Sequence, residues 1–294
     1  MEKEKKKKRG DRTDGYLVRD LDPLHMFMPY LMGSRTENEA VMNEEFDLTE
    51  AIKFIEKKNE NAQYRYTYFH LIVAALAKTI YMRPKMNRFI AGNRYYDRNN
   101  ISFSFVAKNK MSDKGEESLL IIEAEDTQES LVDQIHNKIC SEVYNVREEK
   151  QVDGTTNAIK WLNKIPRPIL KLVCKILFWM VYHDCLPKAL HDFDPYRTSV
   201  FISNLGSIKM SASYHHLINW SLNSVFILVN RAKKTPAFNE DGTYKMVDTI
   251  SMGFTIDERI ADGFYFARSI ELFKYILTHP DILDLPLTQD FTMD

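Results

Sequence analysis

Cysteine and net charge are both scarce in this chain of 294 residues. Its three cysteines, Cys140, Cys174 and Cys185, are too few and too scattered for a disulfide framework or a zinc site, so we predict no metal. The formal net charge is −1, which gives no overall basic field to attract nucleic acid, and none is expected as a partner. Glycine-rich nucleotide-binding loops are also missing. The hydrophobic content of 44% is enough for one large core or two modest ones.

The start of the chain lacks the apolar core of a secretory signal, although it is rich in basic residues. Residues 1–9 read Met-Glu-Lys-Glu-Lys-Lys-Lys-Lys-Arg, and no apolar stretch follows them. Charge blocks of this kind usually stay disordered. We therefore predict a disordered basic tail over residues 1–15 and a cytoplasmic location. Attachment of the tail to RNA or to an anionic membrane is the alternative, and no other feature of the sequence supports it.

No apolar run of the sequence is long enough to span a bilayer. The most apolar one, Ile169–Tyr182, is interrupted by Lys171 and Lys175, and it is shorter than the ~20 apolar residues that a spanning helix needs. Two interpretations remain open. The segment is either a packed amphipathic helix that covers a sheet or a neighbouring subunit, or a helix in a membrane interface with its lysines toward the headgroups. The first is favoured, so membrane association is not expected.

Hydrophobic periodicity predicts a chain of mixed helices and strands. Apolar residues at helical spacing predict helices over residues 67–82, 127–146 and 264–277. Alternating or continuous β-branched runs predict strands over residues 101–107, 119–123, 199–202, 224–229 and 244–254. Residues 16–47 are expected to be extended. This order predicts an α/β fold, a two-layer sandwich of a mixed sheet and helices, in one domain over residues 16–294.

The most informative segment is the turn between the last predicted strand and the last predicted helix. It holds Asp257, Glu258, Arg259, Asp262 and Gly263. This pattern resembles the signature of the chloramphenicol acetyltransferase-like superfamily, and most closely that of the acyltransferase subunits of 2-oxo-acid dehydrogenase complexes. Those subunits carry Asp-His-Arg-x-x-Asp-Gly with the histidine as catalytic base. Every fixed position matches except one, where Glu258 replaces the histidine.

A second segment resembles the same family, about fifty residues before the turn. Phe201–Ile208 contains Ser203 and Asn204 and is similar to the Thr-x-Ser-Asn-x-Gly strand end of those acyltransferases, in which the serine donates to the oxyanion. Taken alone, Ser-Asn-Leu-Gly is also an ordinary turn. The family's lipoyl and subunit-binding domains have no counterpart here, which predicts a lone catalytic-type domain.

The resemblance implies the chemistry, the cofactor and the assembly. Family members transfer an acyl group between coenzyme A and a thiol or hydroxyl of a small-molecule acceptor, at a site built between the subunits of a homotrimer. For this chain it implies Ser203 as the oxyanion donor, Glu258 at the base position, and Asp262 in a structural ion pair that shapes the turn. Asp257, Arg259, Gly263 and Asn204 would support the site.

Glutamate at the base position leaves three readings open. A free thiol has a pKa near ~8.5 and a free glutamic acid one near ~4.3, so proton transfer to the carboxylate is uphill by roughly 5.7 kcal/mol unless burial retunes the acid. In the first reading Glu258 is a base whose pKa is raised by burial. In the second it is a non-functional residue left in a non-catalytic paralogue that binds an acyl carrier or assembles with a partner. In the third reading His215 or His216 supplies the base, since imidazole titrates near neutral pH.

Overall fold

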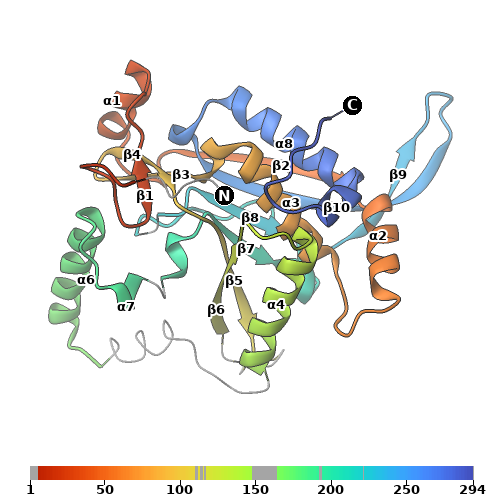
Figure 1. Ribbon diagram of the computed structural model, residues 1–294, viewed down its shortest axis with the longest axis horizontal. Helices are drawn as coiled ribbons and strands as arrows, with labels where there is room; N and C mark the ends of the chain where they lie inside the picture. Colours follow the sequence, from red (N-terminus) through yellow and green to blue (C-terminus); the bar gives the residue numbers. More distant parts are fainter. Residues whose placement is uncertain are drawn as a thin grey trace.

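The computed structural model describes residues 6–109, 112, 115, 117–147, 164–191, 194–220 and 222–293. Within these residues a mixed seven-stranded sheet carries helices on one face, and a three-stranded sheet lies beside it (Figure 1). The α/β fold with a mixed sheet that the sequence predicted is confirmed.

The large sheet is built from strands that are distant in sequence. Its order is β2, β10, β8, β7, β5, β6, with β9 paired to β10. The bounds are Glu39–Asp47 for β2, Ile101–Lys108 for β5, Glu117–Ala124 for β6, Val200–Asn204 for β7, Val225–Val229 for β8, Lys233–Phe238 for β9 and Tyr244–Asp257 for β10. Strand β7 runs parallel to β5 and to β8, and the other pairs are antiparallel. The small sheet joins β1 (Gly15–Leu17), β4 (Arg94–Arg98) and β3 (Arg88–Ala91).

Helices α2, α3, α4 and α8 form the main core with one face of the large sheet. They span Thr49–Asn59, Tyr68–Met82, Leu131–Arg147 and Gly263–Thr278. Helix α3 is the most deeply buried, because every residue from Phe69 to Ile80 is buried. The inward side chains of β7, β8 and β10 alternate with outward ones, so Ile202, Ile227 and Phe254 complete this core. The predicted helices over residues 67–82, 127–146 and 264–277 correspond to α3, α4 and α8.

The opposite face of the sheet is covered by a segment without regular structure. Residues 210–220 cross this face, where Leu217 packs with Phe201, Phe226 and Leu228 in a separate apolar cluster. Short 3-10 helices complete the connections: η1 (Pro84–Asn87), η2 (Pro195–Arg197), η3 (Leu205–Ile208), η4 (Glu258–Ile260) and η5 (Pro280–Asp284).

The part of the chain predicted to be extended contains a helix. Helix α1 spans Pro23–Leu31, where residues 16–47 were expected to be extended. Asp22 caps it by accepting from the backbone N–H of His25 at 3.1 Å, and Pro23 occupies the first turn, where a missing N–H costs nothing. The sequence Asp22-Pro23 therefore marks the start of a helix.

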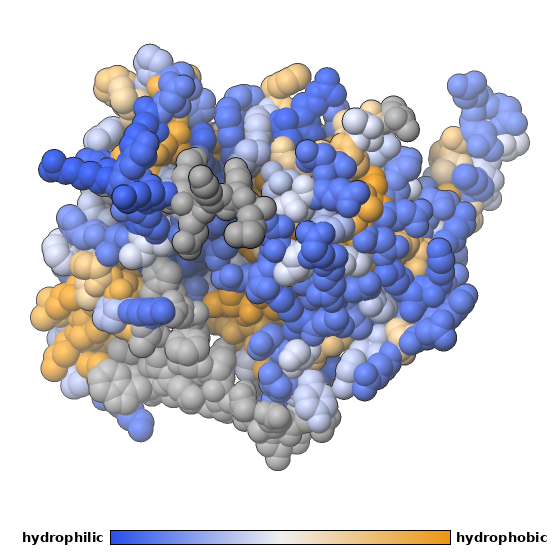
Figure 2. All heavy atoms as spheres, viewed as in Figure 1, coloured by the Kyte–Doolittle hydropathy of each residue, from blue (hydrophilic) through white to orange (hydrophobic). Residues whose placement is uncertain are grey.

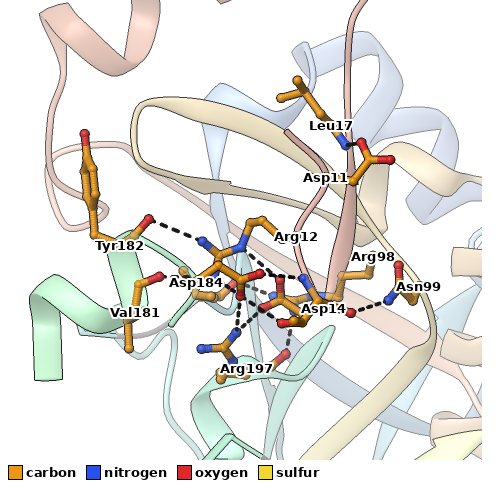
Figure 3. A network of polar contacts seen from close by, with 12 residues as sticks. Asp11, Arg12, Asp14, Leu17, Arg98, Asn99, Val181, Tyr182, Asp184 and Arg197 are labelled. Atoms are coloured by element: carbon orange, nitrogen blue, oxygen red, sulfur yellow. Dashed lines mark hydrogen bonds and ion pairs between the residues drawn. The ribbon is translucent and has the colours of Figure 1, made fainter. Parts of the chain in front are cut away.

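The predicted disordered tail is wrong for the residues that the structure describes, which begin at Lys6. Arg12 is buried, and its guanidinium pairs with Asp14 at 2.9 Å and with Asp184 at 3.2 Å (Figure 3). Arg197 also pairs with Asp14. Burial by itself would raise the pKa of Asp14, but Arg197 and Arg12 lower it from 3.8 to about 2. Residues 1–5 of the predicted tail lie outside the described residues.

Helices α6 (Arg167–Tyr182) and α7 (Lys188–His191) lie apart from the main core (Figure 1). The prediction that residues 169–182 form a helix is confirmed. The C-terminal end of α6 packs on the small sheet, where Val181 joins the apolar cluster of Phe89, Ala91 and Tyr96. Val181 is the one buried residue of α6. Among the described residues no helix has the length and apolar character needed to cross a membrane. The cytoplasmic location stays a prediction.

Candidate functional site

The turn after β10 is held together by a buried ion pair between Asp257 and Arg259. Arg259 donates to both carboxylate oxygens of Asp257, from Nε at 2.8 Å and from Nη2 at 2.7 Å. The side chains of Asp257 and Arg259 are 0% and 2% exposed. Arg259 also donates from Nη1 to the carbonyl oxygen of Met32 at 2.8 Å, which ties the turn to the end of α1. These two predicted supporting residues therefore fix the shape of the turn.

Glu258 projects from this turn into solvent. Its side chain is exposed, and its backbone N–H donates to the carbonyl oxygen of Asn38 at 2.9 Å. Because Arg259 is engaged by Asp257 and Met32, its guanidinium does not point at Glu258. The described residues of this chain therefore leave the side chain of Glu258 unburied.

Asp262 has a different role from the one predicted. It is the N-cap of α8, accepting from the backbone N–H of Tyr265 at 2.8 Å, and this hydrogen bond lowers its pKa. The prediction that Asp262 makes the structural ion pair of the turn is wrong, because Asp257 makes that pair. Gly263 is the first residue of α8, and a Cβ added there would meet no atom within 4 Å, so space does not require glycine at this position.

Ser203 and Glu258 lie at opposite ends of the sheet. Ser203 on β7 pairs in register with Leu228 on β8, and Leu228 pairs with Gly253 on β10. Glu258 comes five residues after Gly253, just past the end of β10, and β10 lies two strands away from β7. At ~3.4 Å per residue and ~4.8 Å between strands, this separation is roughly 20 Å. The two predicted catalytic residues are therefore not brought together within one chain, and β8 lies between their strands.

The turn after Ser203 has its own structural cause. The side-chain oxygen of Asn204 accepts from the backbone N–H of Ser207 at 3.3 Å and caps η3. A Cβ added at Gly206 would stand 2.7 Å from the hydroxyl of Tyr68 and 2.9 Å from the carbonyl oxygen of Asn230. Asn204 and Gly206 thus shape the strand end, and Ser203 remains half-buried at its edge.

His215 and His216 lie on the sheet face between the two ends. The ring of His215 stacks on Phe226 at 4.2 Å between centroids, and on His216 at 4.4 Å. Phe226 pairs in register with Phe201 on β7 and with Thr255 on β10. His215 therefore lies over the middle of the sheet. Along the strands, it is closer to Ser203 than Glu258 is to Ser203.

The hydrogen bond of His215 selects its tautomer. Its Nδ1 lies 2.8 Å from the carbonyl oxygen of His216. A carbonyl oxygen only accepts, so the ring proton is assigned to Nδ1 and Nε2 keeps its lone pair. This is the arrangement that a neutral imidazole needs to act as a base.

The sequence did not reveal the residues that hold residues 210–220, the histidine segment, in place. A Cβ at Gly253 would stand 2.1 Å from the carbonyl oxygen of Ser213, so glycine permits the close approach. Asn230 accepts from the N–H of Ala212 at 2.9 Å and donates to its carbonyl oxygen at 3.0 Å. The glycine inside a β-branched strand was the one signal of such an approach.

Two polar cavities lie away from both candidate ends. One, of about 240 Å³, is lined by residues that include Asp14, Arg98 and Arg197. The other, of about 500 Å³, is lined by residues that include His136 and Cys140. Across the described parts of the chain, no three His, Cys, Asp or Glu side chains are grouped as metal ligands.

The sequence and the structure both resemble known acyltransferases. Residues 188–285 match the family model described as 2-oxoacid dehydrogenases acyltransferase (catalytic domain). A solved structure of a probable dihydrolipoamide acetyltransferase from Listeria monocytogenes 4b F2365 is 18% identical with a TM-score of 0.57, over 89% of this chain and 94% of that chain. No curated protein matches the sequence.

Two further solved structures have the same architecture. The cubic core of a pyruvate dehydrogenase multienzyme complex is 14% identical with a TM-score of 0.58, over 91% of this chain and 94% of that chain. A chloramphenicol acetyltransferase is 10% identical with a TM-score of 0.56, over 90% of this chain and 98% of that chain. The matched residues 188–285 include Ser203, His215 and Glu258. The chain therefore has the chloramphenicol acetyltransferase-like fold and, over residues 188–285, the sequence pattern of the 2-oxoacid dehydrogenase acyltransferase catalytic domain.

Proposed function

We propose that this protein transfers acyl groups between coenzyme A and the thiol or hydroxyl of a small-molecule acceptor, at a site formed between subunits of a homotrimer. The placement of Ser203 and Glu258 at opposite ends of one sheet carries the proposal. Copies arranged head to tail around a threefold axis would bring the Ser203 end of one subunit to the Glu258 end of the next. The exposure of Glu258 in a single chain supports this arrangement.

In such a site, Ser203 donates to the oxyanion of the tetrahedral intermediate. A donor aimed at developing charge contributes ~10²–10³ in turnover. Coenzyme A supplies the acyl group as a thioester or accepts it as a thiol. The proton of the acceptor has to move to a base, and this chain offers Glu258 from one end of the sheet and Nε2 of His215 from the middle.

A similar solved structure supports roles for Ser203, Glu258 and Asp262. In the dihydrolipoamide acetyltransferase of Azotobacter vinelandii, the role of a serine, a histidine and an asparagine four residues later in the catalytic mechanism has been investigated. That enzyme is 15% identical to this chain with a TM-score of 0.58, over 91% of this chain and 94% of that one. In this chain the corresponding roles would fall on Ser203, Glu258 and Asp262, with glutamate in place of the histidine.

The competing function is that of a non-catalytic paralogue that binds an acyl carrier or assembles with a partner. The observation that favours it is Glu258 itself, because an exposed carboxylate is a poor acceptor for the proton of a thiol. Isothermal titration with coenzyme A is the first test, since acyl transfer and acyl-carrier binding both predict binding, whereas a paralogue that only assembles with a partner does not. Light scattering that finds a monomer at every concentration would contradict the subunit-boundary site.

The acyl-transfer rates of variants distinguish Glu258 as the base, His215 as the base, and a non-catalytic protein. With a panel of acyl-coenzyme A donors and a thiol acceptor, Ser203→Ala should lower turnover ~10²–10³-fold in any active protein. If Glu258 is the base, Glu258→Gln abolishes transfer. If His215 is the base, Glu258→Gln is tolerated and His215→Gln removes activity, while His216→Gln is the matched control. Coenzyme A binding without turnover, with partial activity gained in Glu258→His, would identify the non-catalytic paralogue.

A further inference from the structure

The outer face of helix α6 is apolar and continuous, and no helix or strand among the described residues covers it. Ile169, Leu172, Ile176 and Trp179 recur at intervals of three and four residues, which places them on one side of the helix. All four are exposed; Leu172 and Trp179 are 59% and 58% accessible. Figure 2 shows the apolar side chains gathered at the position of α6. We refer to these four residues as the apolar stripe.

The helix is fixed to the protein by its inner face and its C-terminal end. Val181 is buried, and Arg12 donates to the carbonyl oxygens of Val181 at 3.1 Å and Tyr182 at 3.4 Å. Phe178 packs edge-on against Trp220, with 4.4 Å between ring centroids. The apolar stripe is therefore presented by an anchored helix and is not part of a loose segment.

The charges on α6 all have one sign. Arg167, Lys171 and Lys175 are exposed, and the helix contains no aspartate or glutamate, although the whole chain has a net charge of −1. Lys171 and Lys175 are four residues apart, on the same side of the helix, and they border the apolar stripe. An apolar stripe with a cationic border and an aromatic residue is typical of helices that lie in a lipid–water interface.

We propose that α6 lies in the surface of an anionic membrane, with the apolar stripe below the headgroups and Lys171 and Lys175 against the lipid phosphates. The 16 residues of α6 form a helix of ~24 Å, which suits an orientation parallel to the surface and a depth of ~5–10 Å. The alkyl stems of the lysines add apolar contact while their ammonium groups reach the phosphates. Trp179 would lie at the membrane–water interface, where tryptophan side chains are enriched.

A second copy of this chain, paired symmetrically through α6, fits the same face less well. Symmetric contact through the apolar stripe would bring the lysines of the two helices together, and like charges oppose such pairing. A surface of anionic lipid complements both the apolar stripe and the charge of α6. The proposal does not depend on acyl transfer, because α6 contains neither Ser203 nor Glu258.

Vesicle flotation of the full chain tests the proposal. The protein should float with vesicles of phosphatidylcholine mixed with phosphatidylserine, bind weakly to phosphatidylcholine alone, and be released by salt. Lys171→Gln with Lys175→Gln should weaken binding about 25-fold, since each basic residue near an anionic surface contributes about fivefold. Lys53→Gln with Lys57→Gln, an exposed pair with the same spacing on α2, is the matched control and should bind like the wild type.

Two further variants test the depth of the helix. Leu172→Ser with Ile176→Ser should remove binding and leave the thermal unfolding temperature unchanged, because both side chains are exposed. Tryptophan fluorescence should shift to the blue on anionic vesicles, and Trp179→Phe should bind while losing most of this shift. Absence of flotation, equal weakening by the α2 control, or self-association that Leu172→Ser with Ile176→Ser abolishes would each overturn the proposal.

Discussion

Replacing Asp14 with asparagine should reveal how firmly the N-terminal segment is built into the fold. Asp14 is paired with Arg12 and Arg197, and its side chain is 8% exposed (Figure 3). Asp14→Asn keeps the shape of the side chain and removes its charge. Two buried guanidinium groups would then lose a shared counter-ion, and Asp184 would be the one described carboxylate that still pairs with both.

The magnitude follows from the pKa of Asp14. The native pKa is about 2 and the ordinary value is 3.8. At about 1.4 kcal/mol per unit, ionised Asp14 contributes roughly 2.5 kcal/mol at neutral pH. Because the native pKa is depressed, this contribution is fully present above the unfolded-state pKa and is lost as the pH falls through about 2. Removing one member of a buried pair typically costs ~3–5 kcal/mol, so a loss of about 3 kcal/mol is expected.

Urea unfolding at a series of pH values measures the effect. The difference in unfolding free energy between the wild type and Asp14→Asn should be constant from about pH 7 to about pH 5 and should narrow below about pH 4. Asp248→Asn is the control, because Asp248 pairs with Lys234 at the surface at 2.9 Å and should lose less than ~1 kcal/mol. A loss at Asp14 no larger than at Asp248, or one that does not change with pH, would refute the reasoning.

Three substitutions in the turn and on the sheet face give further predictions. Gly253→Ala should lower the unfolding free energy by ~1–3 kcal/mol and displace the histidine segment, because its Cβ would collide with the carbonyl oxygen of Ser213. Gly263→Ala, with open space around it, should be neutral or stabilising by up to ~1 kcal/mol; equal melting temperatures for the two would contradict this account. Asp257→Asn should cost ~3–5 kcal/mol in urea unfolding because Arg259 stays buried without its carboxylate, and a loss under ~1 kcal/mol would show that the pair is not structural.

The predictions that held are those that depend on short-range pattern. Helical spacing located α3 and α8, and alternating β-branched residues located β5 and β10, because periodicity directly reflects which side chains face a core. The residue pattern of the turn was also readable, since a strand followed by Asp257, Arg259 and a capping Asp262 is a local arrangement. Even there, the pattern did not tell which aspartate pairs with Arg259. That choice depends on burial at the end of β10, which only the packing of α1 and η4 provides.

The tertiary structure decided what depends on partners distant in sequence. Arg12 is paired with Asp184, and its neighbour Asp14 with Arg197, both from segments distant in sequence, so a segment that reads as a solvated tail is part of the fold. Likewise, α6 has the pattern of a packed helix, but no sheet in the described part of the chain covers its outer face. Ser203 and Glu258 were expected in one site between subunits, and within a single chain β7 and β10 run in opposite directions, so the two residues stand at opposite ends of the sheet. The sequence thus determined the helices, the strands and the reactive side chains. The direction of the strands and burial by residues distant in sequence determined where those side chains lie relative to one another.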